Sequence, residues 1–291
     1  MSLGALPRRE RAVTRPGSDG LLELVAEPAP DGRTFLSKRR QRFPLRLTTP
    51  LYLDPARPGM AFVYMQNPSG GLFEGDDHSI SLTARPGALV HLTTQAASKA
   101  YRTDSGCARQ RVELAVAADA FVEYVADPLI PHAGARFEQD VVANVGPGGA
   151  LIVAETVAPG RVAFGEAFEY TRLSLDTRIS CDGEEAAVDS VLLEPSKLDP
   201  RRPGILGEYA YLSSLFAVQP GGDAEALARS IAAAVENTSD CLGATGVLPS
   251  ESGVLARMLA SSGISAQRVL RAAWTAARTA LLGAPPPPRR K

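Results

Sequence analysis

Short stretches of alternating apolar and polar residues recur along most of the chain. In one of them, Val112, Leu114 and Val116 alternate with Arg111 and Glu113, which is the period of two of a half-buried β-strand. Short apolar runs lie at residues 21–26, 34–36 and 43–47, and comparable stretches predict strands at residues 60–66, 79–84, 88–94, 109–116, 121–125, 141–145, 150–156, 168–179 and 187–193. Turns rich in Gly, Pro and Asp separate them, and no helical pattern lies between them, so the fold is predicted to be mainly β.

A turn that leads directly into a strand recurs at residues 86–90, 118–122 and 146–153. Repetition of this kind is typical of stacked β layers, so we expect an elongated, β-helix-like stack of many short strands. The basic run at residues 38–40 is expected at a solvated edge or turn.

The pattern changes in the C-terminal third, where alanine becomes frequent. Leu227 and Ile231 are four residues apart, which predicts a helix over residues 223–235 with Asp223 as its cap. Apolar surface in this third of the chain would suit the docking of a partner protein if it were exposed.

Two closing strands are predicted at residues 243–249 and 252–259, followed by a second helix over residues 265–282 with Ser265 as its cap. The two helices of the predicted fold therefore both lie in the C-terminal third.

The domain organisation follows from these patterns. Residues 1–20 are expected to form a flexible leader, residues 21–283 a single mainly β domain, and residues 284–291 a disordered tail rich in Pro and Arg.

Composition excludes several classes of function. The 291 residues include 31 basic and 32 acidic side chains, for a net charge of −1. This balance argues against nucleic acid or an anionic membrane as the main partner. The chain shows no secretory signal and no apolar run of about 18 residues, and its three cysteines are widely spaced, so we expect a cytoplasmic protein without a disulfide framework.

One turn concentrates glycine and charge. Gly70 and Gly75 have the glycine spacing of a P-loop, but Asp76 and Asp77 follow them where a P-loop has Lys and Ser or Thr. Carboxylates at these positions would repel a phosphate, so nucleotide binding is disfavoured. If the strands that flank the turn are neighbours, Asp76 and Lys99 are expected near one another at one end of a sheet.

Candidate metal ligands are mostly oxygen. His78, His91 and His132 are the only histidines and are not closely spaced, and no Cys-x-x-Cys motif exists, so no stable metal site is predicted. His91 is expected on the outer face of a strand. Weak and transient metal binding would fall to the carboxylates Asp76, Asp77, Asp127, Glu155 and Glu166.

No catalytic residue is predicted with support from a motif. A nucleophile elbow is absent. Glu155 and Glu166 could form a carboxylate pair for glycoside hydrolysis on stacked β layers, but the sequence does not set their separation.

Five stretches, in order, resemble the urease accessory protein D family, called H in some organisms. They are Asn67-Pro68-Ser69-Gly70-Gly71-Leu72 with Gly75-Asp76, residues 93–102, Asp127-Pro128 to Arg136, Glu155 with Pro159-Gly160-Arg161, and Gly165-Glu166-Ala167-Phe168. The resemblance runs from about Leu21 to the C-terminal helix.

The resemblance implies a maturation factor rather than an enzyme. Members of the family bind the structural subunits of apo-urease and recruit the accessory F protein and the GTPase G protein, and the complex loads nickel. The implied fold, an elongated stack of strands with two helices, agrees with the pattern above. No stably bound cofactor is implied, only nickel in transit.

An internal passage for nickel has been proposed for this family, and four residues match its polar positions: Asp76, Ser98, Glu155 and Glu166. Lys99 and Arg161 would position the carboxylates. The supporting motif residues are Gly70, Gly71, Gly75, Thr94, Gln95, Lys99, Arg102 and Arg161. Weak oxygen ligands suit a carrier that must release its ion.

One position departs from the family pattern. The family often has Gly-Gly-Asp where this chain has Glu74-Gly75-Asp76, so the turn is expected to differ locally. Two alternatives remain open: a β-solenoid carbohydrate-active enzyme that uses Glu155 and Glu166, and a pure interaction scaffold without an ion path.

Overall fold

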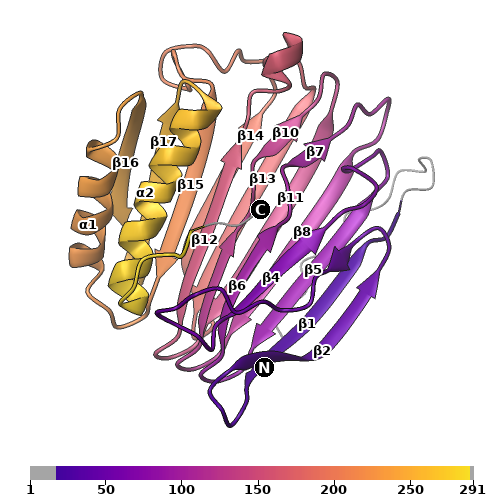
Figure 1. Ribbon diagram of the computed structural model, residues 1–291. Coiled ribbons are helices and arrows are strands. Elements are labelled where there is room, and N and C mark those ends of the chain that lie inside the picture. Colours follow the sequence, from indigo (N-terminus) through magenta and orange to yellow (C-terminus); the bar gives the residue numbers. More distant parts are fainter. Residues whose placement is uncertain (1–17, 289–291) are drawn as a thin grey trace.

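The computed structural model describes residues 18–288, which form two stacked β-sheets and two α-helices that cover one of them (Figure 1). Sheet A has seven strands in the order β14 (Glu184–Leu193), β13 (Arg172–Cys181), β11 (Arg136–Val145), β8 (Ala108–Val116), β5 (Asp77–Ala84), β1 (Leu21–Pro28) and β2 (Thr34–Arg42).

Sheet B follows the order β16 (Cys241–Val247), β17 (Gly253–Ala260), β15 (Tyr211–Val218), β12 (Ala150–Val157), β9 (Phe121–Val125), β6 (Leu89–Thr94), β4 (Ala61–Gln66) and β3 (Arg46–Leu47), and the short β7 (Ser98–Ala100) and β10 (Leu129–Pro131) complete it. The helical elements are α1 (Ala224–Glu236), α2 (Gly263–Leu282) and the single turns η1 (Val162–Phe164) and η2 (Pro249–Glu251).

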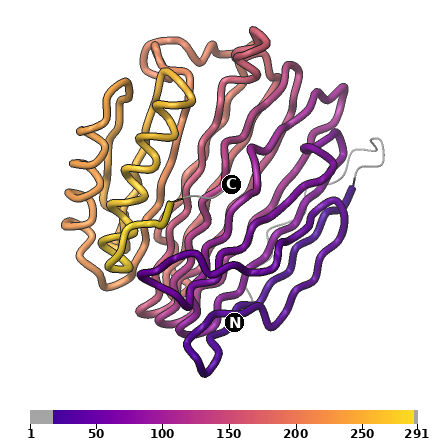
Figure 2. Tube along the Cα trace, in the orientation of Figure 1, coloured from indigo at the N-terminus to yellow at the C-terminus, as the bar shows by residue number. Residues whose placement is uncertain are grey.

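The central strands stack because the chain moves from one sheet to the other and back. As a result β5, β8, β11 and β13 run parallel in sheet A, and β4, β6, β9 and β12 run parallel in sheet B. Figure 2 shows these successive passes lying side by side. The expected β-helix-like stack of strands, with two helices in the C-terminal third, is confirmed.

The main core lies between the two sheets. Side chains at alternate positions point inward from both sheets, among them Leu82 and Leu114 from sheet A and Leu92 and Val153 from sheet B, all at most 1% exposed. Complete burial of such a side chain contributes about 1.5–3 kcal/mol, so the alternation of apolar residues explains why these segments adopt strands at all.

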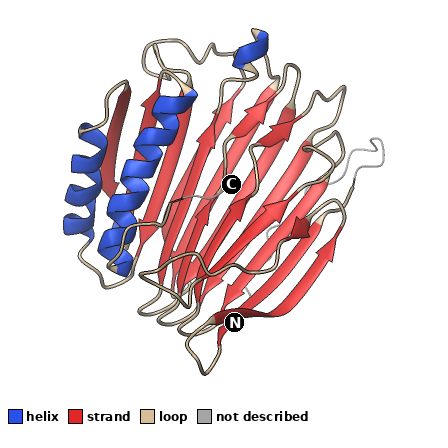
Figure 3. Ribbon diagram, in the orientation of Figure 1, coloured by secondary structure: helices blue, strands red, loops and turns tan. Residues whose placement is uncertain are grey.

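Both helices lie on the opposite face of sheet B (Figure 3). Asp223 caps α1 as predicted, accepting a hydrogen bond from the N–H of Ala226 at 2.8 Å, and Ile231 is fully buried against the sheet. The cap of α2 was predicted wrongly, because Ser262 accepts the N–H of Ser265 at 3.1 Å and the helix begins at Gly263. This packing buries most of the apolar residues that were expected to suit partner docking.

Some strands were not predicted. Strand β15 was missed, as were the three-residue β7 and β10. Residues 38–40 belong to β2, an edge strand of sheet A, which agrees with their expected place at an edge.

The two ends of the predicted domain also have contacts. Of the expected leader only residues 18–20 are described, and Gly20 accepts a hydrogen bond from the N–H of Ser79. In the described part of the predicted tail, Arg278 donates to the carbonyls of Ala284 and Pro285. Arg271 donates likewise to the next two prolines.

A buried ion cluster joins α2 to sheet B; it consists of Asp54, His91, Glu123, Trp274 and Arg278, each at most 3% exposed. The Glu123 carboxylate contacts Nδ1 of His91 at 2.9 Å, accepts a hydrogen bond from Nε1 of Trp274 at 2.8 Å and lies 3.3 Å from Nε of Arg278. Arg278 also pairs with Asp54. His91 does lie on the outer face of a strand, but α2 covers it.

Substitution of Arg278 by Ala is expected to lower the free energy of unfolding by roughly 3–5 kcal/mol, because Asp54 and Glu123 would remain buried without their cation. Urea unfolding followed by the fluorescence of Trp274, the single tryptophan, measures the change. The matched control is Arg268→Ala on the same helix, whose exposed ion pair with Asp240 is worth at most about 1 kcal/mol. Equal losses in the two variants would contradict the prediction.

Candidate functional site

Loops that are distant in the sequence meet at one end of the sandwich, which we call the motif end (residues 67–77, 93–107, 127–136 and 157–171). Leu72 forms a parallel bridge with Ala100 of β7, and β7 pairs with β10. Leu129 of β10 pairs in turn with Val157 of β12. The loops that carry most of the family resemblance thus gather around one small ladder, near the labels β7 and β10 in Figure 1.

The glycines at the motif end allow a ring to lie against the backbone. Gly70 has a φ of +89°, and a Cβ on Gly71 would lie 2.5 Å from the carbonyl oxygen of Lys99 and 2.6 Å from Cε2 of Tyr101. The side chain of Asn67 closes the turn by donating to the carbonyl of Gly71 at 2.8 Å. The glycine pattern therefore serves close packing.

Glu74 ties the turn to the loop that follows β7. Its carboxylate accepts the N–H groups of Asp104, Ser105 and Gly106 at 2.7, 3.3 and 2.8 Å. These hydrogen bonds, that from Asp104 first, lower the pKa of Glu74 to about 2. Gly75 beside it has a φ of +84°. The residue that departs from the family pattern is therefore an anchor of the motif end.

Asp76 fastens the end of the turn. One carboxylate oxygen accepts both the N–H and the hydroxyl of Ser18 at 2.8 Å, and the other accepts the N–H of Phe73 at 2.9 Å. The residue is 5% exposed. Lys99 lies at the same end of the molecule, but it is exposed on β7 in sheet B, whereas Asp76 precedes β5 of sheet A.

Glu166 joins two loops of the motif end. Arg161 binds its carboxylate through Nε, at 2.8 Å, and through a second guanidinium nitrogen, and Ala133 donates its N–H at 3.3 Å. The hydrogen bonds from Arg161 hold the pKa of Glu166 below its usual range. The role of Arg161 in positioning carboxylates of an ion path stays a prediction. Ser98, the remaining candidate at this end, begins β7.

Aromatic rings gather at the motif end. Phe73 and Tyr101 stack with their centroids 4.5 Å apart, and His132 meets Tyr101 edge-on at 4.6 Å. Burial, followed by the positive charge of Arg161, lowers the pKa of His132. The Phe164 ring lies under the Arg161 guanidinium at 5.1 Å and is 76% exposed.

The supporting motif residues make backbone contacts. The hydroxyl of Thr94 accepts the N–H of Asp127 at 2.9 Å, and Gln95 donates its N–H to the carbonyl of Met65 at 2.8 Å. Arg102 forms an antiparallel bridge with Ala135. These backbone contacts fix the loops, while the side chains of Gln95 and Arg102 remain exposed.

Beneath the motif end a polar row runs between the two sheets; it consists of the buried His78 and the half-buried Gln110, Gln139 and Glu155. His78, Gln110 and Gln139 are neighbours in register on sheet A. Each occupies an alternate position of its strand that faces sheet B, as do the apolar residues of the core on the same strand. Nε2 of Gln110 donates to Gln139 at 3.0 Å, and Gln139 donates to Glu155 on the facing sheet. The row begins beside Asp76, whose carboxylate lies 3.8 Å from Nε2 of His78.

His78 is an unusual member of this row. It is 1% exposed, and neither ring nitrogen has a hydrogen-bond partner among the described residues. Burial lowers the pKa of its imidazole, although Asp76 opposes the shift. A neutral imidazole with free nitrogen atoms can bind water or a cation.

Glu155 faces polar groups from both sheets. It lines a cavity of about 10 Å³ together with Thr177, Asp189, Ser214 and Arg257, room for roughly one water molecule. Burial raises the pKa of Glu155 to about 7, and the hydrogen bond from Gln139 partly offsets the shift. Glu155 is therefore the candidate whose charge changes near neutral pH.

The structure separates the sequence-predicted residues into two groups. Asp76, Ser98 and Glu166 lie at the motif end, and Glu155 lies in the core below. Sequence reasoning missed Gln110 and Gln139, although a signal existed: each interrupts the apolar, inward-facing positions of its strand.

Glu155 and Glu166 do not form the facing pair that a glycosidase needs. Glu155 lines the interior cavity, whereas Glu166 is paired with Arg161 in a loop. Within residues 18–288 no group of three or more His, Cys, Asp or Glu gathers as metal ligands.

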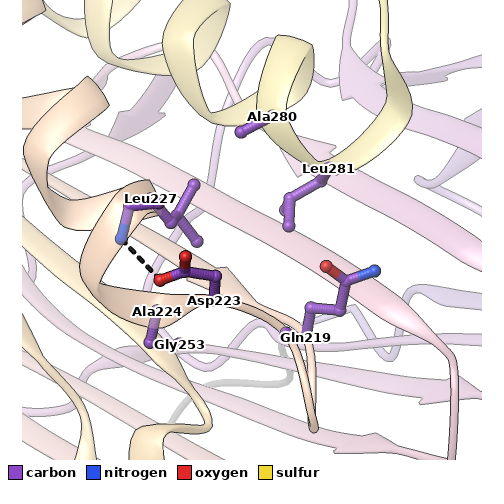
Figure 4. A pocket seen from close by; sticks show the side chains of 9 residues that line it. Gln219, Asp223, Ala224, Leu227, Gly253, Ala280 and Leu281 are labelled. Atoms are coloured by element: carbon purple, nitrogen blue, oxygen red, sulfur yellow. Dashed lines mark hydrogen bonds between the residues drawn. The ribbon is translucent and has the colours of Figure 1, made fainter.

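A larger cavity of about 180 Å³ lies elsewhere, between the first turn of α1 and the last turn of α2 (Figure 4). Its lining includes Gln219, Leu227, Gly253, Leu281 and the α1 cap Asp223. None of the five motifs contributes to it.

Replacement of Glu155 by Gln is expected to remove part of the pH dependence of stability. A folded-state pKa of about 7, above the ordinary value, means that the neutral carboxyl stabilises the fold at low pH and that this contribution disappears as the pH rises through 7. The variant should therefore be more stable than the wild type at pH 8, by up to roughly 3 kcal/mol. Urea unfolding of the variant and the wild type between pH 5 and 8 measures this difference in stability. A difference that does not change with pH would contradict the raised pKa of Glu155.

No helix among the described residues is long and apolar enough to cross a membrane.

Comparison with known proteins identifies the family. The model of the family described as UreD urease accessory protein matches residues 18–291. The urease accessory protein UreD of Haloarcula marismortui is 35% identical over 97% of this chain and 93% of its own length. UreD 2 of Streptomyces griseus is 38% identical, with coverages of 95% and 94%, and UreD of Mycolicibacterium gilvum is 37% identical, with 92% and 96%. A match of this extent shows that the protein belongs to the UreD urease accessory protein family.

Proposed function

We propose that this protein is a cytoplasmic urease maturation factor that binds the structural subunits of apo-urease and brings the accessory F protein and the GTPase G protein to them. Membership of the UreD urease accessory protein family carries the proposal. The role is that of an accessory protein and not of a catalyst, and nickel is cargo rather than a resident cofactor.

The polar row is the proposed route for nickel in transit. It begins at His78, beside Asp76, and reaches Glu155 through two glutamines. Carboxylate, amide and imidazole groups bind nickel without the strength of a thiolate site, so an ion could be handed on. Ser98 and Glu166 stay candidates for the part of the route at the motif end.

The dimensions of the row restrict how nickel would move. Because the cavity at Glu155 holds about one water molecule, a hydrated ion has to exchange its water for side-chain ligands. Glu155, with a pKa of about 7, can exchange a proton for a cation near neutral pH at little cost.

The alternative is a pure scaffold without an ion path. Its support is that Asp76 and Glu166 already accept hydrogen bonds that hold the motif end together. Substitution of either residue therefore disturbs the loops and any path at once. Glu155 distinguishes the ion-path hypothesis from the pure-scaffold hypothesis better than Asp76 or Glu166 does, because its replacement by Gln keeps an acceptor for the hydrogen bond from Gln139.

Omission of this chain from a mixture of apo-urease, F protein, G protein, GTP and nickel is expected to abolish urease activation. With the chain present, Glu155→Gln should lower the activation rate at limiting nickel by at least roughly tenfold, because the row loses its only carboxylate, while binding to the partners stays unchanged. The measurements are urease activity over time and size-exclusion chromatography of the complex.

The matched control is Glu225→Gln, which removes an exposed carboxylate on α1 and should activate like the wild type. If the chain proves dispensable, the maturation role fails. If activation requires the chain but Glu155→Gln activates urease as fast as the wild type, the maturation role stands. The pure-scaffold hypothesis then replaces the ion path.

A further inference from the structure

The free edges of the two sheets differ in how well they are protected. An unpaired edge strand attracts other strands, and proteins block it with charged side chains, short strands or bulges, while glycine within a strand weakens its pairing. Among the described residues, β2 carries Lys38, Arg39 and Arg40, β3 has two residues, and β16 contains Gly243 and Gly246. The fourth edge, β14 of sheet A, has a register shift and two glutamates at its start, and residues 187–193 beyond them carry no basic side chain, no glycine and no further register shift.

Strand β14 is long and presents apolar side chains. It has ten residues, and β13 is its one strand neighbour within residues 18–288. On the outer face of the sheet Val188 and Leu192 are 55% and 54% exposed, with Ser190 between them. The inward Asp189 is paired with Arg257, so it does not present a free charge at this edge.

The side-chain order of β14 is self-complementary. In an antiparallel pair of two β14 strands centred on Ser190, Val188 of each copy faces Leu192 of the other, on the outer face. Directly opposed apolar pairs of this kind each stabilise a sheet by roughly 0.2–1 kcal/mol. The inward Asp189 then faces Val191, and no two like charges are opposed.

Other registers are worse. A shift must keep inward residues inward, so the opposed pairs change in steps of two residues. One step places Asp189 opposite its own copy, and the opposite step places Val188 opposite Glu194. The pairing centred on Ser190 is the one that matches both exposed apolar residues.

We propose that two copies of this chain associate through β14, antiparallel about a two-fold axis at Ser190, and join their seven-stranded sheets into one continuous sheet. The interface is isologous, as in most homodimers. It uses the side of the sandwich away from β2, and it leaves the motif end and the polar row unaltered.

Sedimentation velocity of the full chain over about 1–100 µM tests the association. The wild type should show a concentration-dependent species of twice 30.7 kDa. Val188→Lys/Leu192→Lys should raise the dissociation constant at least roughly tenfold, because like charges then face each other. The control Leu242→Lys, which alters a 57% exposed leucine on the edge strand β16, should behave as the wild type.

The register is tested by crosslinking. In a background with Cys107, Cys181 and Cys241 replaced by Ser, Ser190→Cys should form a covalent dimer under mild oxidation faster than Leu242→Cys does. A protein that stays monomeric at every concentration overturns the proposal, as does a dimer that survives the double lysine variant. A rate for Ser190→Cys no higher than that for Leu242→Cys overturns the register.

Discussion

The structure depends on the constraint that the long central strands, from β4 to β13, alternate between the two sheets. Each pass of the chain adds one parallel strand to sheet A and one to sheet B, so the side chains that meet in the middle must match level by level. Most levels are apolar, and their burial supplies the main stabilisation. Parallel neighbours in one sheet are in register, so a polar residue on one strand lies beside the residue at the matching position of the next strand. His78, Gln110 and Gln139 form a row in this way.

The same constraint brings the motifs together. Loops that connect the sheets at one end lie beside one another even when they are thirty residues apart in the sequence, as β7 and β10 do. The motif end is held by backbone and carboxylate contacts from Glu74, Asp76 and Glu166, and the row below it carries a carboxyl group that titrates near neutrality. Glu74, Asp76 and Glu166 thus fix the loops of the motif end, whereas the proposed nickel ligands of the polar row are other residues.

Much of the fold could be predicted from alternation and turns, as in the strand that contains Val112 and Leu114. Strand β15 escaped prediction because Leu212, Leu215 and Phe216 are part of a run buried on both faces of the sheet, which removes the period of two. The strands β7 and β10 exist only through pairing with distant segments, which local sequence does not reveal.

The candidate site was predictable in part. Asp76, Glu155 and Glu166 could be singled out by resemblance, but their surroundings could not, because each depends on contacts with residues from other loops or the other sheet. The buried ion cluster was invisible for the same reason: Glu123 and Trp274 are 151 residues apart.

The ion cluster has a consequence for synthesis on the ribosome. Asp54 emerges 224 residues before Arg278, and Glu123 also precedes α2. Until that helix is translated, Glu123 on sheet B and Asp54 in the loop before β4 lack their counter-charge, so this face of the sheet remains hydrated and accessible to chaperones. Helix α2, which is translated last, therefore supplies the cation that pairs with Asp54 and Glu123. A chain that ends before α2 would leave this face of sheet B uncovered and these two carboxylates unpaired.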